Sequence, residues 1–314
     1  MPRIADRNLD GVAFLFRTRD EAEARSQLGG SAFFIGRAIA GSENTPNGPT
    51  YVPYLISNRH VVWNTGAPFA SLNRRDGNPP DVIEIDQTEW HVHPSGADLA
   101  AVCMLGRFDR ATHKTTFLQD KYLLTKEFMH NADIGVGDEV FMMGRFLNHQ
   151  GQVHNRPAAR FGSLSMMLEP LWNDALKRDE EGFAVEMRSR TGFSGSPVTV
   201  YRTPATVLTD VPEEHRDFFR LLGVNWGYVL DQGGENTWLN GVVPAWKIVE
   251  LLEGVPELRK QQDHATDEFF RLMRSGTQSA ATTEGAPESS QTFGAGPPGG
   301  FRLDRTVPGT GAPR

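Results

Sequence analysis

The sequence has one cysteine, Cys103, among its 314 residues. No internal disulfide can form, and a zinc site built from several thiolates is excluded. Disulfides commonly brace small secreted domains, so a single cysteine favours a reduced compartment, and we expect a cytoplasmic protein. Cys103 lies in the apolar run 100–105, which predicts a small core residue and carries no signature of a nucleophile.

Long hydrophobic runs and an excess of basic residues are also missing. No stretch approaches the roughly 20 apolar residues that span a bilayer, and the apolar run 12–16 is shorter than a signal-peptide core of about 7–15 residues. Lys and Arg total 32 against 39 Asp and Glu, which gives a net charge of −7. We therefore expect neither membrane insertion nor nucleic-acid binding, since the latter needs a basic face.

Short apolar runs separated by Gly, Pro and Asn make up most of the chain. Many short strands with such punctuation are typical of a β-barrel or β-sandwich. The predicted strands cover residues 12–17, 31–39, 51–57, 82–85, 99–105, 139–144, 183–187, 197–201, 221–229 and 238–243.

Helices are predicted in four places. Residues 117–130 read as a helix linking two halves, and 169–178 as a helical insertion. Apolar residues at i, i+3 and i+4 around Ile248 predict a third helix, and 257–273 continue as a further one. The segment 275–314 is rich in Gly and Pro and predicts a disordered tail, either a solvated leftover or a recruitment segment for a protein partner.

Three short segments together contain the residue types that nucleophilic catalysis by a serine requires. His60 ends an apolar strand, Asp98 opens another, and Ser194 lies in the glycine-rich turn 191–198. A serine hydroxyl becomes a nucleophile when an imidazole takes its proton, and a carboxylate fixes the tautomer of that imidazole. Glycines beside the serine let backbone N–H groups turn inward, so Gly192 and Ser194 would bind a developing oxyanion.

Each segment alone also has a plainer interpretation: a hydrogen-bonded structural histidine, an ordinary turn aspartate, a tight turn. His91 and His93 alternate on a predicted strand, but no third metal ligand is evident, so we expect no metal and no cofactor. The order His, Asp, Ser, with each residue at a strand end, is what favours a catalytic triad.

These segments resemble the trypsin-like (chymotrypsin-fold) serine peptidases, in particular their bacterial members. The resemblance covers about residues 10–255. The matching motifs, in chain order, are Gly29–Ile35, Ser57–Val62, Ala97–Ala100, Val136–Val140 with Gly144, and Gly192–Pro197.

The resemblance implies an all-β fold of two antiparallel six-stranded barrels with a cleft between them. Residues 1–10 would be a lead-in, 11–107 barrel one, 108–134 a linker, 135–255 barrel two and 256–274 a helical extension before the tail. Asn225, Trp226 and Gly227 would pair with an extended protein or peptide substrate, and Gly241 would lie across the primary specificity pocket. Such binding would be strand addition, with main-chain bonds supplying affinity.

Two positions depart from the family pattern. Phe193 stands before the nucleophile, where digestive members carry an aspartate that pairs with a newly cut N-terminus. We therefore expect no activation by N-terminal cleavage. Arg188, near the base of the specificity pocket, would favour an acidic substrate side chain if it pointed inward. Otherwise it would point to solvent and pair with one of the acids at 179–181 and 186.

The sequence thus predicts a serine endopeptidase that acts through His60, Asp98 and Ser194 and an acyl-enzyme. An alternative is a sensing or binding module on the same fold whose activity is latent or gated by a partner. A non-peptidase acyl hydrolase is a third interpretation, but nothing in the sequence indicates a small-ester pocket.

Overall fold

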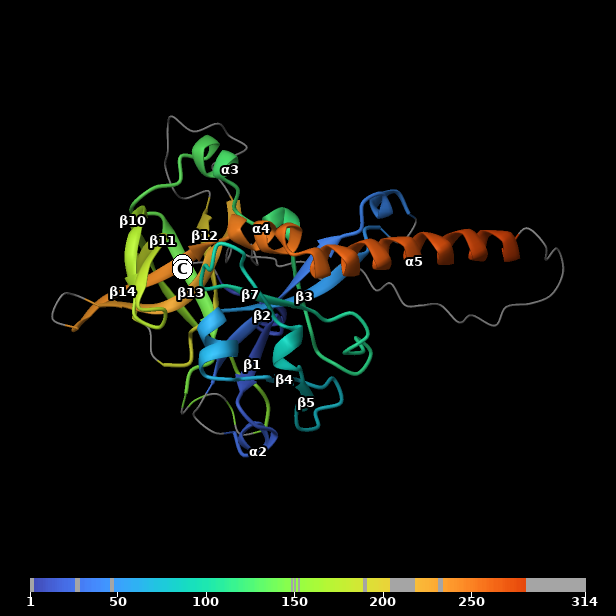
Figure 1. The fold of residues 1–314 in the computed structure, drawn as a ribbon, viewed down its shortest axis with the longest axis horizontal. Coiled ribbons are helices and arrows are strands. Elements are labelled where there is room, and N and C mark those ends of the chain that lie inside the picture. Colours follow the sequence, from blue (N-terminus) through green and yellow to red (C-terminus); the bar gives the residue numbers. More distant parts are fainter. Residues whose placement is uncertain are drawn as a thin grey trace, which may run out of the picture.

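The computed structural model describes residues 3–280 apart from 26–28, 46–47, 148, 150, 152, 189–190, 204–217 and 231–233, with the backbone alone for 275–280. Of the predicted tail, residues 281–314 lie outside the described residues. The described chain forms two consecutive β units followed by two helices (Figure 1).

The first unit is an eight-stranded sheet. Seven strands pair antiparallel in the order β5-β4-β1-β2-β3-β7-β6, and β8 adds to β2 in parallel. The strands are β1 (Val12–Phe16), β2 (Gly30–Ala38), β3 (Tyr51–Ser57), β4 (Phe69–Leu72), β5 (Asp81–Glu84), β6 (His91–Val92), β7 (Ala100–Cys103) and β8 (Leu118–Gln119).

The second unit is a closed antiparallel barrel in the order β10-β11-β14-β13-β12-β9. Its strands are β9 (Glu139–Gly144), β10 (Ala158–Asn173), β11 (Arg178–Glu186), β12 (Pro197–Arg202), β13 (Phe218–Leu230) and β14 (Asn236–Pro244). The prediction of an all-β, chymotrypsin-like fold of two β units is confirmed. The second unit closes as the expected six-stranded barrel, whereas the first is an eight-stranded sheet.

Helices are short except at the C-terminal end of the described chain. They are α1 (Asp6–Leu9), α2 (Arg19–Glu23), α3 (Lys126–Asn131), α4 (Trp246–Gly254) and α5 (Pro256–Ala280), with single turns η1 (Ser42–Asn44), η2 (His60–Asn64), η3 (Gln87–Glu89) and η4 (Asp120–Tyr122). Helix α5 extends past residue 275, where the tail was predicted to begin.

Two helix predictions were wrong. The segment 117–130 holds β8, η4 and all but the last residue of the short helix α3, which begins only after Thr125, whose hydroxyl accepts the Phe128 N–H at 3.0 Å. The segment 169–178 is the end of the β10–β11 hairpin. Its burial alternates, with Leu171 and Asn173 buried and Trp172 exposed, which is the period of a strand.

The burial of β1 on both of its faces explains why its sequence is continuously apolar. Ala13 and Leu15 point into the core of the first unit, whereas Phe14 and Phe16 join a core that extends through the second barrel. All five residues of β1 are buried, since successive side chains point to opposite faces and both faces are covered. Strand β1 is therefore one of several strands, with β2, β3 and β7, whose two faces belong to different core clusters.

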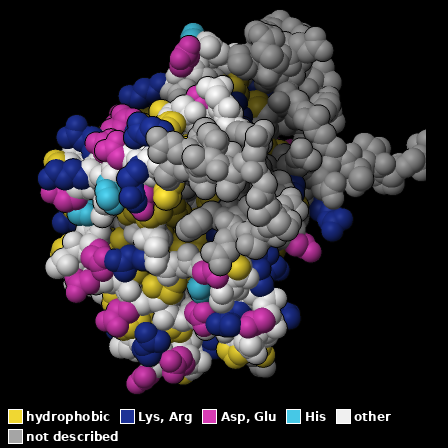
Figure 2. All heavy atoms as spheres, turned by 90° about the vertical axis from the view of Figure 1, so that its right-hand side faces the viewer, with side chains coloured by type: hydrophobic (Ala, Val, Ile, Leu, Met, Phe, Trp, Pro, Cys, Tyr) yellow, Lys and Arg dark blue, Asp and Glu magenta, His cyan; other side chains and the backbone are white. Residues whose placement is uncertain are grey.

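The C-terminal helices pack against the body before α5 extends away from it (Figure 1). Leu258 near the start of α5 is fully buried, and the Tyr54 hydroxyl of β3 donates to Gln262 Oε1 at 3.1 Å. Of the helices in the described residues, none combines the length and apolar character that a bilayer crossing requires. Figure 2 shows acidic and basic side chains interspersed over the described part of one face.

Candidate active site

His60 and Asp98 meet at the end of the first sheet. His60 is the first residue of η2, directly after β3, and Asp98 lies in the loop that leads into β7. His60 Nδ1 is 2.6 Å from Asp98 Oδ2, and the His60 N–H donates to Asp98 Oδ1 at 2.9 Å. The carboxylate therefore holds both the ring and the backbone of the histidine. Asp98 is fully buried and His60 is 9% exposed.

Asp98 is itself held by three residues that sequence reasoning missed. Asn58 Nδ2 donates to the Asp98 carbonyl at 2.8 Å, and Asn173 Nδ2 donates to its carboxylate at 3.2 Å. The Asp98 N–H donates to Glu180 Oε1 at 2.8 Å. Asn173 and Glu180 belong to the β10–β11 hairpin of the second barrel. The prediction of a helix at 169–178 concealed these two residues, because only the paired strands of a hairpin place Asn173 diagonally across from Glu180.

Ser194 lies in a turn before β12 that the first unit holds in place. The Ser31 N–H of β2 donates to the Ser194 carbonyl at 2.8 Å, and the Gly195 N–H donates to Asn225 O at 2.9 Å. Gly195 has φ +84°, and a Cβ there would lie 2.0 Å from Ser31 O, so glycine is required for this close approach. Ser194 is partly exposed.

The Ser194 hydroxyl points to a backbone carbonyl. Its Oγ donates to Trp226 O at 3.3 Å, and among the described residues it has no hydrogen bond to His60. The structure thus joins His60 and Asp98 directly and brings Ser194 to the same junction of the two units, with its hydroxyl turned to β13.

The Gly192 peptide beside Ser194 is fixed by a buried hydroxyl. Ser31 Oγ donates to Gly192 O at 2.8 Å and accepts the Arg145 N–H at 2.8 Å. The Gly192 carbonyl is therefore turned to the protein interior, with φ +103° at Gly192. Within the described residues, the N–H groups of Gly192 and Ser194 have no hydrogen-bond partner. Ser31 entered the sequence argument only as part of a strand motif.

Phe193, at the position of the activation aspartate of digestive peptidases, is fully buried. Its ring centre lies 6.4 Å from that of Phe146, and the Arg160 guanidinium lies 5.8 Å from it. The turn is therefore anchored here by apolar packing.

The residues expected to bind substrate lie on β13 and β14. Asn225 pairs with Val242, and its side chain donates to Phe193 O at 2.9 Å, which ties it to the nucleophile turn. A Cβ on Gly227 would lie 3.7 Å from Ser194 Oγ. Among the described strands, none pairs with the side of Trp226 and Gly227 that faces away from β14, because the pairing of β12 with β13 stops at residue 224.

Gly241 and Gly182 make room for the Trp226 indole. A Cβ on Gly241 would lie 2.0 Å from Trp226 Cε2, and one on Gly182 would lie 2.5 Å from its ring. Trp226 is only 3% exposed. The indole therefore fills the space above Gly241, so Gly241 shapes this region through Trp226.

Arg188 follows β11 and is exposed. Among the described residues no ion pair or hydrogen bond involves it, so the expected pairing with one of the acids at 179–181 or 186 is not formed.

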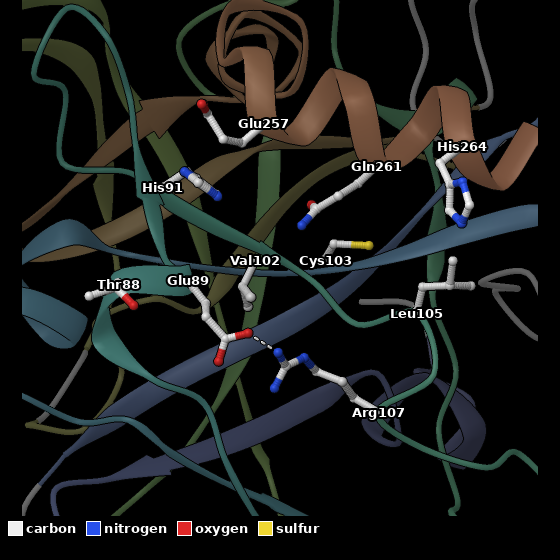
Figure 3. Close-up of a pocket in the computed structure, with 10 residues that line it drawn as sticks. All are labelled: Thr88, Glu89, His91, Val102, Cys103, Leu105, Arg107, Glu257, Gln261 and His264. Carbon is white, nitrogen blue, oxygen red and sulfur yellow. Dashed lines mark hydrogen bonds and ion pairs between the residues drawn. The ribbon is translucent and has the colours of Figure 1, made fainter.

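A separate cavity of about 420 Å³ lies between β6, β7 and α5 (Figure 3). His91 and Cys103 line it on the side of the sheet and Glu257 on the side of the helix, and an Arg107–Glu89 ion pair closes one edge. Burial raises the pKa of the Cys103 thiol, which keeps it protonated. Within the described residues, no group of three or more His, Cys, Asp or Glu side chains could hold a metal ion.

Both the sequence and the fold of this chain can be compared with known proteins. No protein-family model and no curated protein matches the sequence. Among solved structures, the fold is similar to the MamO protease domain of Magnetospirillum magneticum, with 14% identity, a TM-score of 0.46 and coverage of 78% of this chain and 96% of that one. The strand topology, two consecutive antiparallel β units, agrees with the fold that the sequence resemblance to the trypsin-like serine peptidases implied.

Two further solved structures are similar to this chain. The Rv3671c protease of M. tuberculosis in its inactive form matches with 14% identity, a TM-score of 0.43 and coverage of 81% and 97%. The HtrA-type protease AlgW, solved with a decapeptide, matches with 14% identity, a TM-score of 0.42 and coverage of 79% and 65%. Identities this low concern the fold and not the activity.

Proposed function

We propose that this chain is a serine endopeptidase. The observation that carries the proposal is the 2.6 Å contact between His60 Nδ1 and Asp98, beside a Ser194 turn that the first unit holds through Ser31. A carboxylate that binds Nδ1 leaves Nε2 as the basic nitrogen, which is the form a general base requires. This is the triad logic established for this fold, applied to these three residues.

The proposed reaction begins when the Ser194 hydroxyl leaves the Trp226 carbonyl and turns to His60. His60 takes the hydroxyl proton as Ser194 attacks the peptide carbonyl, and then gives it to the leaving amine. Asp98 stays ionised and stabilises the imidazolium. The unpartnered N–H groups of Gly192 and Ser194 would hold the oxyanion. Water then releases the acyl group by the same steps.

The substrate we propose is an extended peptide, and the open side of β13 supports this. Beside Ser194, the pairing of β12 with β13 ends at residue 224, and no described strand pairs with that side of Trp226 and Gly227. A peptide added there would gain main-chain hydrogen bonds. Trp226 and Gly227 would contact it, Asn225 and Gly241 would shape the adjoining surface, and the exposed Arg188 would favour an acidic side chain.

One observation favours the alternative, a binding or sensing module with gated activity. The Ser194 hydroxyl donates to Trp226 O and not to His60. A partner or substrate that engages the Trp226 carbonyl would free the hydroxyl. Such a partner could act through the tail, which lies outside the described residues. For location we keep the cytoplasm, because the one cysteine is a buried free thiol.

A fluorophosphonate tests both proposals, since it reacts only with an activated serine. We expect the isolated protein to be labelled at Ser194 and Ser194→Ala to lose both the label and peptide hydrolysis by several orders of magnitude. Ser95→Ala is the matched control, because Ser95 is an exposed serine whose Oγ lies 2.8 Å from His93 Nδ1, a histidine 3.4 Å from Glu250, but outside the glycine-rich turn of Ser194. Hydrolysis by Ser194→Ala at the wild-type rate would overturn the peptidase. Labelling that needs an added partner would favour the gated module.

A further inference from the structure

The β10–β11 hairpin of the second barrel reaches the acid of the first unit. Two residues of this hairpin contact Asp98, Asn173 through the carboxylate and Glu180 through the backbone N–H. The hairpin turn also touches the flanks of the pair. Asn64 of η2 donates to Ala175 O at 3.2 Å, and Arg178 donates to the Gly96 carbonyl.

The orientation of the Asn173 amide is determined by its own turn. Asn173 Oδ1 accepts the N–H groups of Ala175 at 3.1 Å and Leu176 at 3.3 Å. Its NH₂ group must therefore face the other way, where its two hydrogens meet Asp98 Oδ2 and Glu180 Oε2, each at 3.2 Å. Asn173 bridges two buried carboxylates and cannot rotate without losing contacts on both sides.

Glu180 lies behind the acid as a second buried carboxylate. It is 5% exposed, and its two oxygens accept from the Asp98 N–H and from Asn173. Burial and the nearby charge of Asp98 raise the pKa of Glu180, while its two hydrogen bonds and Lys247 of α4 act in the opposite direction. When ionised, Glu180 adds a negative charge close to the position where His60 becomes positive.

We propose that Asn173 and Glu180 are positioning residues for the His60–Asp98 pair, supplied by the second barrel. The inference deepens the proposed peptidase function and rests on it. Asp98 Oδ2 must point at His60 Nδ1 while Oδ1 holds the His60 backbone, and Asn173 fixes that plane from the third side. Glu180 fixes the Asp98 backbone and orients Asn173. Any movement of the hairpin relative to the first unit therefore changes the position of the Asp98 carboxylate.

The decisive variants are Glu180→Gln and Asn173→Ala. Glu180→Gln keeps the shape of the side chain but removes its charge and turns an NH₂ group toward the NH₂ of Asn173, so the bridge to Asp98 weakens. Both changes disfavour the imidazolium form of His60 relative to its neutral ring. Glu181→Gln is the matched control. Glu181 is the next residue of β11 and carries the same charge as Glu180, but its side chain is exposed to solvent.

Two readouts separate this inference from the proposed function. The first is the pH dependence of kcat/KM, in which activity falls at low pH as His60, the proposed base, becomes protonated. We expect Glu180→Gln to move that fall to lower pH, and Asn173→Ala to lower kcat about 10- to 100-fold at unchanged KM, as small misplacements of catalytic groups do. The second is the far-downfield NMR resonance of the His60 Nδ1 proton and its titration, which needs no turnover.

The outcomes are distinct. If no variant and no wild type hydrolyses peptides, but Glu180→Gln lowers the titration midpoint of His60 while Glu181→Gln does not, the positioning role stands and the peptidase proposal falls. If Glu180→Gln and Glu181→Gln give the same His60 titration, with wild-type kcat in Glu180→Gln, the positioning role is overturned. Because Glu180→Gln is isosteric, it keeps the test open should Asn173→Ala fail to fold.

Discussion

Ser31 offers the sharpest test of whether the Gly192–Ser194 turn forms the oxyanion site that we propose. Its hydroxyl is fully buried, accepts the Arg145 N–H and donates to Gly192 O, each at 2.8 Å. Ser31→Ala removes both contacts and leaves a backbone donor and a backbone acceptor unpaired inside the protein. The perturbation is small in volume, and the β-strand backbone that contacts Ser194 O is unchanged.

The expected loss of stability follows from those two orphaned groups. Leaving one buried polar group unsatisfied costs about 1–3 kcal/mol, so we expect Ser31→Ala to lower the free energy of unfolding by about 2–4 kcal/mol. That is a large part of the 5–15 kcal/mol that typically stabilises a domain, yet the fold should survive. Urea titration followed by tryptophan fluorescence measures the change.

The expected loss of reactivity is separate. Without the hydroxyl, the Gly192 carbonyl is free to rotate, and the adjoining N–H groups lose their fixed direction. Removal of a whole oxyanion donor costs about 10²–10³-fold, so we expect this loosening to slow fluorophosphonate labelling of Ser194 about 10- to 100-fold.

Ser42→Ala is the matched control for this experiment. Ser42 is also a fully buried serine, donating to Ile39 O at 2.6 Å and accepting the Thr50 N–H at 2.9 Å, but it lies in η1 outside the site. It should lose comparable stability and keep the wild-type labelling rate. Equal labelling rates in Ser31→Ala, Ser42→Ala and the wild type would refute the view that Ser31 orders the loop.

Two further substitutions test the packing of the site and of the C-terminal helix. Gly195→Ala should abolish labelling and destabilise strongly, because its Cβ would collide with Ser31 O and Ser57 Oγ; Gly77→Ala, with φ +78° and open space around it, should cost only the about 1–2 kcal/mol of a left-handed residue. Leu258→Ala should lower the unfolding free energy by about 2–5 kcal/mol in urea titrations, since Leu258 is fully buried. A wild-type midpoint for that variant would mean that α5 is not docked in solution.

Local pattern sufficed where a strand has an apolar run and clear turn signals. The segments 51–57 and 139–144 are strands with the predicted bounds, and β1 differs by one residue. The predicted order of His60, Asp98 and Ser194 at strand ends also matches where the chain places them. Such segments are determined mostly by their own residues, because burial and β preference agree there.

Pattern failed where distant segments determine the structure. Residues 169–178 contain helix-forming Leu, Lys and Arg, but pairing of β10 with β11 overrides that preference. Asn173 and Glu180 look like surface residues in the sequence, since polar side chains are seldom fully buried. Their burial is explained only by Asp98, which lies 82 residues from Glu180 along the chain. The role of Ser31 could not be predicted for the same reason, because its partners Gly192 and Arg145 are distant in the sequence.

Strand β1 has a consequence for how the molecule can be divided. Because its two faces complete the cores of both units, a fragment ending before β9 would expose Phe14 and Phe16, and the complementary fragment would lack that packing. Separately expressed halves should therefore reassemble as obligate partners. The stretch between α3 and β9 is accordingly a natural break point for a two-fragment complementation experiment.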